Sequence, residues 1–172
     1  MKRVLIVAAL LYPFALPAHA ETNWSAALAG TDGIVIYCKS TTRQPYAAEI
    51  CEALGKTIAA RFEGAALSAT TAGIVYTESA AKDGEPSDPA ALMKADGVGK
   101  PLAIGIHIKG TDDGNPAIYV GVRAIAPGAS GDLLLDEAEV VANGPRKKLP
   151  KVLIDHMARK TEPMTNAIRS AL

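Results

Sequence analysis

The sequence predicts an α+β fold in which helices pack on one face of a single mixed β-sheet of about five strands. Three observations predict it. Short β-branched runs alternate with segments whose apolar residues recur every three or four positions, no linker divides the chain, and each helical segment has one apolar stripe to bury. The predicted order of elements is β-α-β-α-β-β-β-α.

The start of the chain has the three parts of a secretory signal peptide. Two basic residues precede an apolar run over 4–16, and the small-x-small sequence at 18–20 is typical of a cleavage site. The apolar run is too short to span about 30 Å of hydrocarbon. We therefore expect residues 1–20 to be removed and residues 21–172 to form one periplasmic or secreted domain without an integral membrane segment.

Composition and charge argue against several partners. Of the 18 basic residues two lie in the signal, which leaves 16 basic against 18 acidic residues in the mature chain. This balance provides no attraction to nucleic acid or to anionic lipid. Aromatic residues make up 5% of the chain and Trp24 is its one tryptophan, so an aromatic-lined carbohydrate pocket is not indicated.

Cys38 and Cys51 both lie in the exported part of the chain, where thiols oxidise. Their spacing excludes a C-x-x-C redox motif, and there is no second pair for a zinc site. We expect a structural disulfide that contributes about 3 kcal/mol to stability. Two buried free thiols are the alternative, which a mass measurement under non-reducing conditions would detect.

The first half of the chain predicts two strands around an amphipathic helix. GIVIYC at 33–38 predicts the first strand, residues 46–62 the helix, and residues 69–78 the second strand. Because Cys51 faces the core from this helix, a bond to Cys38 would join the helix to the end of the first strand.

The second half predicts a short helix, a strand meander and a closing helix. Asp88 is suited to cap the short helix, and 101–109 and 116–126 predict two strands. Residues 133–142 fit a strand or a helix, and the strand is favoured because short loops usually join neighbouring strands. Pro163 should kink or split the closing helix.

This order of elements resembles the small periplasmic modules of the TolB N-terminal and CsgG-like kind. The resemblance extends over about residues 31–172 and rests on the order of elements and on the strand-like runs GIVIYC, ADGVGKPLAIGI and IYVGVRAI. It implies a binding or assembly role in the cell envelope, and it transfers no catalytic residue.

Residues 103–123, AIGIHIKGTDDGNPAIYVGVR, predict a hairpin whose faces follow from parity. The isoleucines of the first strand lie opposite aliphatic residues of the second only if the numbers of paired residues have an even sum. With the turn centred on its second aspartate, Gly105 pairs with Gly121 and His107 pairs with Tyr119. The paired glycines would then leave a bare strip of backbone.

The glycine-bearing face of this hairpin is the candidate binding surface. Its candidate residues are Gly105, His107, Lys109, Tyr119, Gly121 and Arg123. A ligand, a partner strand or another segment of this chain could lie against it. The alternative is a solvated sheet face with cross-strand charge pairs, to which Glu137 and Glu139 would contribute.

No catalytic or cofactor motif stands out in the sequence. The motifs G-x-S-x-G and H-E-x-x-H do not occur. His156 and Asp155 are adjacent on a predicted helix and point about 100° apart, so the aspartate does not orient the imidazole. The segment 110–116 is shorter than a calcium loop, and 97–101 lacks the spacing of a phosphate loop. We expect no cofactor and no metal.

The run PRKKLPK at 145–151 is a candidate basic patch, formed by Arg146, Lys147, Lys148 and Lys151. It could contact phosphate headgroups, acidic glycans or a protein partner, with an attraction that salt weakens. The alternative is a solvated loop whose charge is offset by acidic residues nearby in the sequence.

The sequence does not specify a reaction. It favours a non-catalytic periplasmic binding or assembly-accessory protein that contacts an envelope protein or peptide through a sheet edge or its glycine-bearing face. The alternative is a small exported hydrolase or inhibitor with a site around His107, Tyr119 and Arg123. A carrier for a small hydrophobic ligand would need an enclosed apolar cavity. The partner, the oligomeric state and the strand order do not follow from the sequence.

Overall fold

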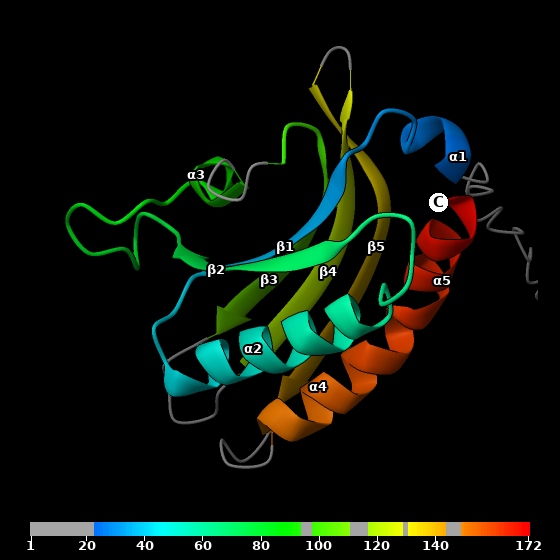
Figure 1. Cartoon of the computed structure of the whole chain (residues 1–172). Helices are drawn as coiled ribbons and strands as arrows, with labels where there is room; N and C mark the ends of the chain where they lie inside the picture. Colours follow the sequence, from blue (N-terminus) through cyan, green and yellow to red (C-terminus); the bar gives the residue numbers. More distant parts are fainter. Residues whose placement is uncertain (1–22, 94–97, 111–116, 129–130, 144–148) are drawn as a thin grey trace, which may run out of the picture.

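The chain folds into one mixed β-sheet whose longer helices pack against one face, as the computed structural model shows (Figure 1). The structure describes residues 23–93, 98–110, 117–128, 131–143 and 149–172. The strands are β1 (Gly33–Ser40), β2 (Ala69–Tyr76), β3 (Pro101–Gly110), β4 (Ala117–Gly128) and β5 (Gly131–Asn143). The helices are α1 (Trp24–Ala27), α2 (Pro45–Ala60), α3 (Pro89–Met93), α4 (Leu149–Lys160) and α5 (Glu162–Ala171). The predicted α+β class with a single five-stranded mixed sheet is confirmed.

The strand order is β2-β1-β3-β4-β5. β1 runs parallel to both of its neighbours, and β3, β4 and β5 form an antiparallel meander. The short α3 lies in the return connection from β2 to β3 and contacts β1 and β2. Val35 and Val75 are buried but lie outside the main core cluster, on the sheet face that points away from α2.

The main core lies between the sheet and the helices α2, α4 and α5. Ile104, Ile106 and Ile108 of β3 are fully buried, because every second side chain of a strand points to the same face. They pack in one cluster with aliphatic residues of the neighbouring strand and the three helices, including Val120, Val122, Leu54, Ile58, Met157 and Ile168. This packing leaves the odd-numbered residues of β3 on the opposite face.

Several local predictions are confirmed. The ambiguous segment 133–142 is part of strand β5. Asp88 caps α3, since its Oδ1 accepts the Ala90 N–H at 2.9 Å. The closing helix is split where Pro163 enters the first turn of α5. α1 was not predicted, because a helix of 4 residues is too short to show periodicity.

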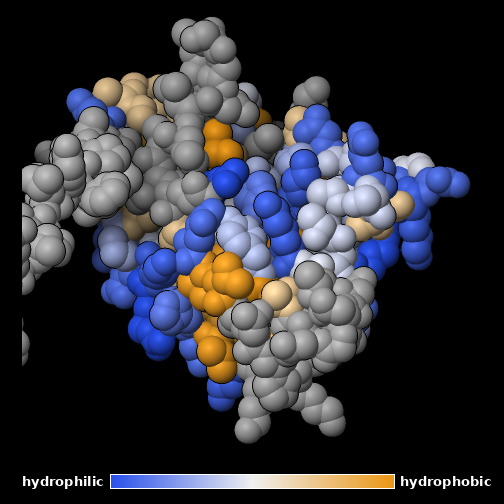
Figure 2. All heavy atoms as spheres, turned by 180° about the vertical axis from the view of Figure 1, so that it is seen from behind, coloured by the Kyte–Doolittle hydropathy of each residue, from blue (hydrophilic) through white to orange (hydrophobic). Residues whose placement is uncertain are grey.

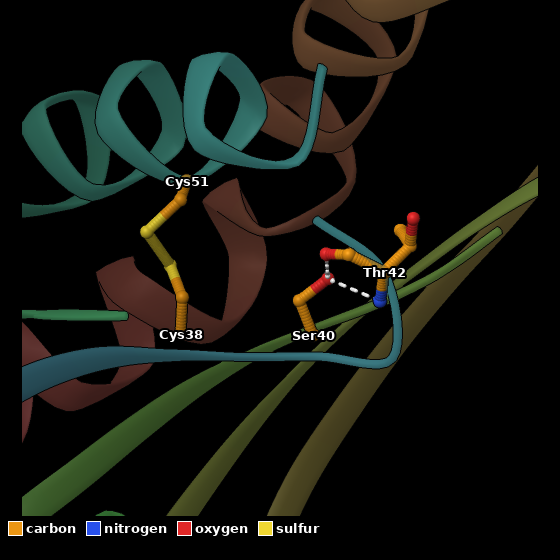
Figure 3. Close-up of a disulfide and its surroundings, with 4 residues drawn as sticks. All are labelled: Cys38, Ser40, Thr42 and Cys51. Atoms are coloured by element: carbon orange, nitrogen blue, oxygen red, sulfur yellow. Dashed lines mark hydrogen bonds between the residues drawn. A yellow bond between two sulfur atoms is a disulfide. The ribbon is translucent and has the colours of Figure 1, made fainter. Parts of the chain in front are cut away.

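A disulfide joins Cys38 at the end of β1 to Cys51 in α2, with the two Cα atoms 6.0 Å apart, which confirms the predicted pairing (Figure 3). The chain turns toward the helix two residues later. There Ser40 Oγ donates to the Thr42 carbonyl at 2.8 Å and accepts the Thr42 N–H at 3.2 Å. These buried bonds shape the connection that brings the helix back over the strand.

Three sequence predictions lie outside the described residues. They are the signal peptide at 1–20, the turn at 111–116 and most of the basic patch, residues 146–148. Within the described part of the chain, no helix combines the length and the apolar character needed to cross a membrane.

Candidate functional site

The β3–β4 hairpin has the predicted parity, but its register differs from the prediction by two residues. The observed pairs are Gly105–Arg123, His107–Gly121 and Lys109–Tyr119. The predicted pairing of Gly105 with Gly121 and of His107 with Tyr119 is therefore wrong, although the six candidate residues do share one face of the sheet.

The register error arises because the alternation of apolar and polar residues fixes which face each side chain is on, but not which residues pair. A shift of one residue would move every side chain to the other face, whereas a shift of two residues leaves each side chain where it was. The hydrophobic pattern therefore cannot distinguish registers two residues apart. Gly110 pairs with Ile118, so the hairpin is centred one residue later than predicted.

Two tyrosines of this chain occupy the space next to the glycines. A Cβ at Gly105 would lie 2.7 Å from Tyr37 Oη, and a Cβ at Gly121 would lie 2.8 Å from Tyr119 Oη. Glycine in a strand often marks such a close approach. The backbone strip is therefore covered by the protein's own side chains, and Tyr37 belongs to a site in which sequence reasoning did not place it.

Tyr119 connects the charged groups at the β4–β5 side of this face. Its hydroxyl donates to the Glu139 carboxylate, and Arg123 Nη2 lies 4.0 Å from Glu139 Oε1. The Lys109 ammonium lies 5.1 Å from the centroid of the Tyr119 ring. Figure 2 shows this side of the molecule, where hydrophilic side chains cover much of the surface beside an exposed hydrophobic patch.

His107 lies half-buried in the middle of this face. Its ring meets the Tyr37 ring edge to face, with the centroids 6.4 Å apart. Burial, and to a smaller extent the positive charges of Arg123, Lys39 and Lys109, together lower the pKa of His107 to about 4. The imidazole is therefore neutral at physiological pH.

This environment does not favour the hydrolase alternative. A general base works best with a pKa near the operating pH, which the His107 imidazole does not have. Its Nε2 atom is buried and has no hydrogen-bond partner among the described residues. The charged groups that act on this histidine are all cations, so none of them serves as the carboxylate that orients a catalytic imidazole.

A second candidate site is an apolar pocket on the helix side of the sheet, between α2 and the β1–β2 strands. Its volume is about 310 Å³. The walls include both cysteines of the disulfide, two isoleucines and the edge of β2, namely Ile36, Cys38, Cys51, Thr71, Gly73 and Ile74. Glu52 and Lys56, which form an exposed ion pair at 2.6 Å, also line it.

The pocket was not predicted, because its existence depends on how far α2 stands from the edge of the sheet. One sequence signal was Gly73 inside a strand-like run. Its φ of 95° is a conformation that favours glycine, and the β1–β2 register shifts next to it. A strand glycine of this kind often indicates a bulge near a functional surface.

The candidate basic patch is described only at one residue. Lys151 is exposed on α4, and the other three basic residues lie outside the described part of the chain. Across the described ranges, no group of three or more His, Cys, Asp or Glu side chains is arranged to hold a metal ion.

Comparisons with known proteins identify no family. No family model matches the chain, and no curated protein matches it. Among solved structures, it is similar to a PelC dodecamer variant from Paraburkholderia phytofirmans, at 15% identity and a TM-score of 0.43, over 78% of this chain and 90% of that one. It is also similar to the hypothetical protein CT253 from Chlamydia trachomatis, at 15% identity and a TM-score of 0.30, over 80% and 93% of the two chains. Scores this low carry no argument about function.

Proposed function

We propose that this chain is a non-catalytic binding or assembly-accessory module of the cell envelope that takes an extended peptide segment of another envelope protein at the β2 edge. The observation that carries the proposal is the apolar pocket of about 310 Å³ beside this strand. A peptide that adds to a sheet as an extra strand needs main-chain hydrogen bonds and a pocket for a side chain. An outer strand next to an apolar pocket offers both.

The backbone of β2 supports this mode of binding. β2 is the outermost strand on its side of the sheet. The Ile34 N–H donates to the Ser68 carbonyl at 3.0 Å, and the slanted bonds of a parallel ladder then engage Thr70. The peptide groups of Thr71 consequently point away from β1, toward an added strand.

Thr71 connects the two parts of the proposed site, because it is exposed and its side chain lines the pocket. An extended segment paired with Thr71 would direct every second side chain toward α2. We propose that one of these is a large apolar side chain, which would lie against the disulfide, Ile36 and Ile74.

The proposed compartment is the periplasm. The disulfide is consistent with an exported protein, because such bonds persist in oxidising compartments. The signal-peptide pattern at residues 1–20 supports the same location. Partners would then come from the envelope.

A pair of adjacent substitutions tests the proposal. Thr71→Trp places an indole in the pocket, whereas Thr70→Trp changes a neighbouring exposed residue whose side chain points to the other sheet face. We expect wild type and Thr70→Trp to recover the same protein from envelope extracts, and Thr71→Trp to lose it. Hydrogen exchange should show slower exchange of β2 amides when the partner is bound. Equal recovery by both variants would exclude the β2 edge.

A further inference from the structure

We propose that the polar sheet face of β1, β3 and β4 is a second docking surface, which binds a carboxylate-rich peptide segment of a partner protein through Lys39, Lys109 and Arg123. This face points away from the pocket between α2 and β2. The inference therefore does not depend on strand addition at the β2 edge.

The strand register brings the three cations together around one position. Lys39 pairs with His107 across β1 and β3, and Arg123 is opposite Gly105, two residues before that histidine. Lys109 lies two residues after it. Neighbouring strands are about 4.8 Å apart and alternate residues about 6.8 Å apart, so each cation starts within roughly 10 Å of His107.

The lysines of this group are not neutralised by the acidic residues around them. In the described part of the chain, neither Lys39 nor Lys109 has a carboxylate within 4.0 Å. Of the described carboxylates, Glu139 accepts the Tyr119 hydroxyl and lies near Arg123, and Glu78 lines the same hollow as Lys39. Glu137 is the residue that pairs with Arg123 in the backbone register of β4 and β5.

The lowered pKa of His107 reflects the positive potential that these cations create at the centre of this face. All three cations act on its imidazole in the same direction, in addition to the effect of burial. Charges that converge on a partly desolvated position attract an anion more strongly than the same charges spread over open surface. A bound carboxylate would relieve this repulsion.

The shape of the face fits an extended peptide rather than a membrane surface. Lys39 and Arg123 are half-buried among their neighbours, and Lys109 is the exposed member of the three. A flat layer of lipid headgroups would contact the exposed Lys109 more fully than the half-buried Lys39 and Arg123. Along the direction of β3, Arg123, Lys39 and Lys109 lie level with residues 105, 107 and 109. Alternate residues of a strand are about 6.8 Å apart, so alternate side chains of an extended peptide would have the same spacing as these cations.

The binding test uses a labelled synthetic peptide of about ten residues, with alternating glutamate and serine, measured by fluorescence anisotropy at low and high salt. The variant Lys39→Gln/Lys109→Gln should bind roughly fivefold more weakly than wild type. The matched control Lys82→Gln/Lys100→Gln removes the same charge from exposed positions outside the strands and should bind like wild type.

A second readout separates docking at this face from general attraction. The pKa of His107, followed by NMR of its ring protons, should rise when the peptide binds. Thr71→Trp should bind the peptide normally, so the two proposals can fail separately. The inference would be overturned if wild type did not bind the peptide, or if the control variant lost as much binding as Lys39→Gln/Lys109→Gln. Weaker binding by Lys151→Gln would also overturn it, because Lys151 lies on α4, outside this face. The same holds for an unchanged pKa of His107, or for binding to anionic lipid vesicles in place of the peptide.

Discussion

The buried side chain of Tyr46, in the first turn of α2, lies across Gly110 at the end of β3. A Cβ at Gly110 would lie 2.9 Å from Tyr46 Cζ and 3.4 Å from Thr42 Cγ2. Tyr46 is only 7% exposed, so it has little room to move. We expect Gly110→Ala to lower the free energy of unfolding by about 1–3 kcal/mol, measured by chemical denaturation.

Gly121→Ala is the matched control for that substitution. A Cβ there would meet the Tyr119 hydroxyl at 2.8 Å and two Tyr119 ring carbons at 3.2 Å, and this half-buried ring can move outward at the cost of its exposed bond to Glu139. We expect a loss of under about 1 kcal/mol, because the strand also gains the lower unfolded-state entropy of alanine. Losses of equal size at the two glycines would contradict the difference in burial that we infer.

Stability should depend on pH through His107. The folded-state pKa is about 4, below the ordinary histidine value of 6.5, so the unfolded chain binds more protons between these values. The contribution of this group is therefore complete above pH 6.5 and is lost as the pH falls toward 4. We expect the melting temperature of wild type to decrease over this range more than that of His107→Gln.

His156→Gln is the control for the pH dependence, because His156 is exposed on α4. Carboxylates also titrate in this range, so the difference between variant and wild type is the quantity to compare. A pH profile of His107→Gln that is parallel to that of wild type would show that this imidazole does not contribute.

The Cys38–Cys51 bond should stabilise the fold by linking α2 to β1. We expect Cys38→Ala/Cys51→Ala to lower the free energy of unfolding by about 2–4 kcal/mol. A reductant should lower the stability of wild type by a similar amount and leave the variant unchanged. Wild type that is insensitive to reductant in denaturation experiments, after reduction is confirmed by mass, would show that the bond is not a stabilising link.

Arg61 connects the end of α2 to the junction of α4 and α5. Its guanidinium donates to Thr161 Oγ1 and Thr165 Oγ1, each at 3.1 Å, and to the Ala158 carbonyl. Removal would take the Arg61 donor from both partly buried threonine hydroxyls, whereas the Ala158 carbonyl would keep the Thr161 hydroxyl as a donor. We expect Arg61→Ala to lower the free energy of unfolding by about 2 kcal/mol.

Two further variants distinguish this network from a general effect of charge. Arg61→Lys should recover only part of the loss, because an ammonium cannot reproduce the planar fork of the guanidinium. Arg159→Ala, at an exposed position of α4, should stay within about 0.5 kcal/mol of wild type. If Arg61→Ala and Arg159→Ala lowered the free energy of unfolding by similar amounts, the hydrogen bonds of Arg61 would not be the cause of the loss.

Features that depend on a few neighbouring residues could be predicted from the sequence. Pro163 lacks a backbone N–H and collides with the preceding turn, so a split in the closing helix could be predicted from its position. The cap at Asp88 depends only on residues within one turn. The disulfide followed from two cysteines placed at the end of a strand and on the core side of the next helix.

The candidate site was predicted less completely. Alternation placed His107, Lys109, Tyr119 and Arg123 on one face, but Lys39 and Tyr37 were not assigned to it. Both belong to β1, and they reach this face only because β1 lies beside β3 in the sheet. Strand order is a property of the tertiary structure and has no signature in either segment alone.

The sequence by itself determined most of the elements, the covalent link and which residues of the β3–β4 hairpin face the core, because hydrophobic periodicity and turn chemistry act over a few neighbouring residues. Only the tertiary structure decided the register of the β3–β4 hairpin, since a shift of two residues leaves both faces unchanged. It also decided that Tyr37 covers Gly105 and that α2 leaves a pocket beside β2. Those contacts join residues far apart in the chain, so they exist only once the sheet has assembled.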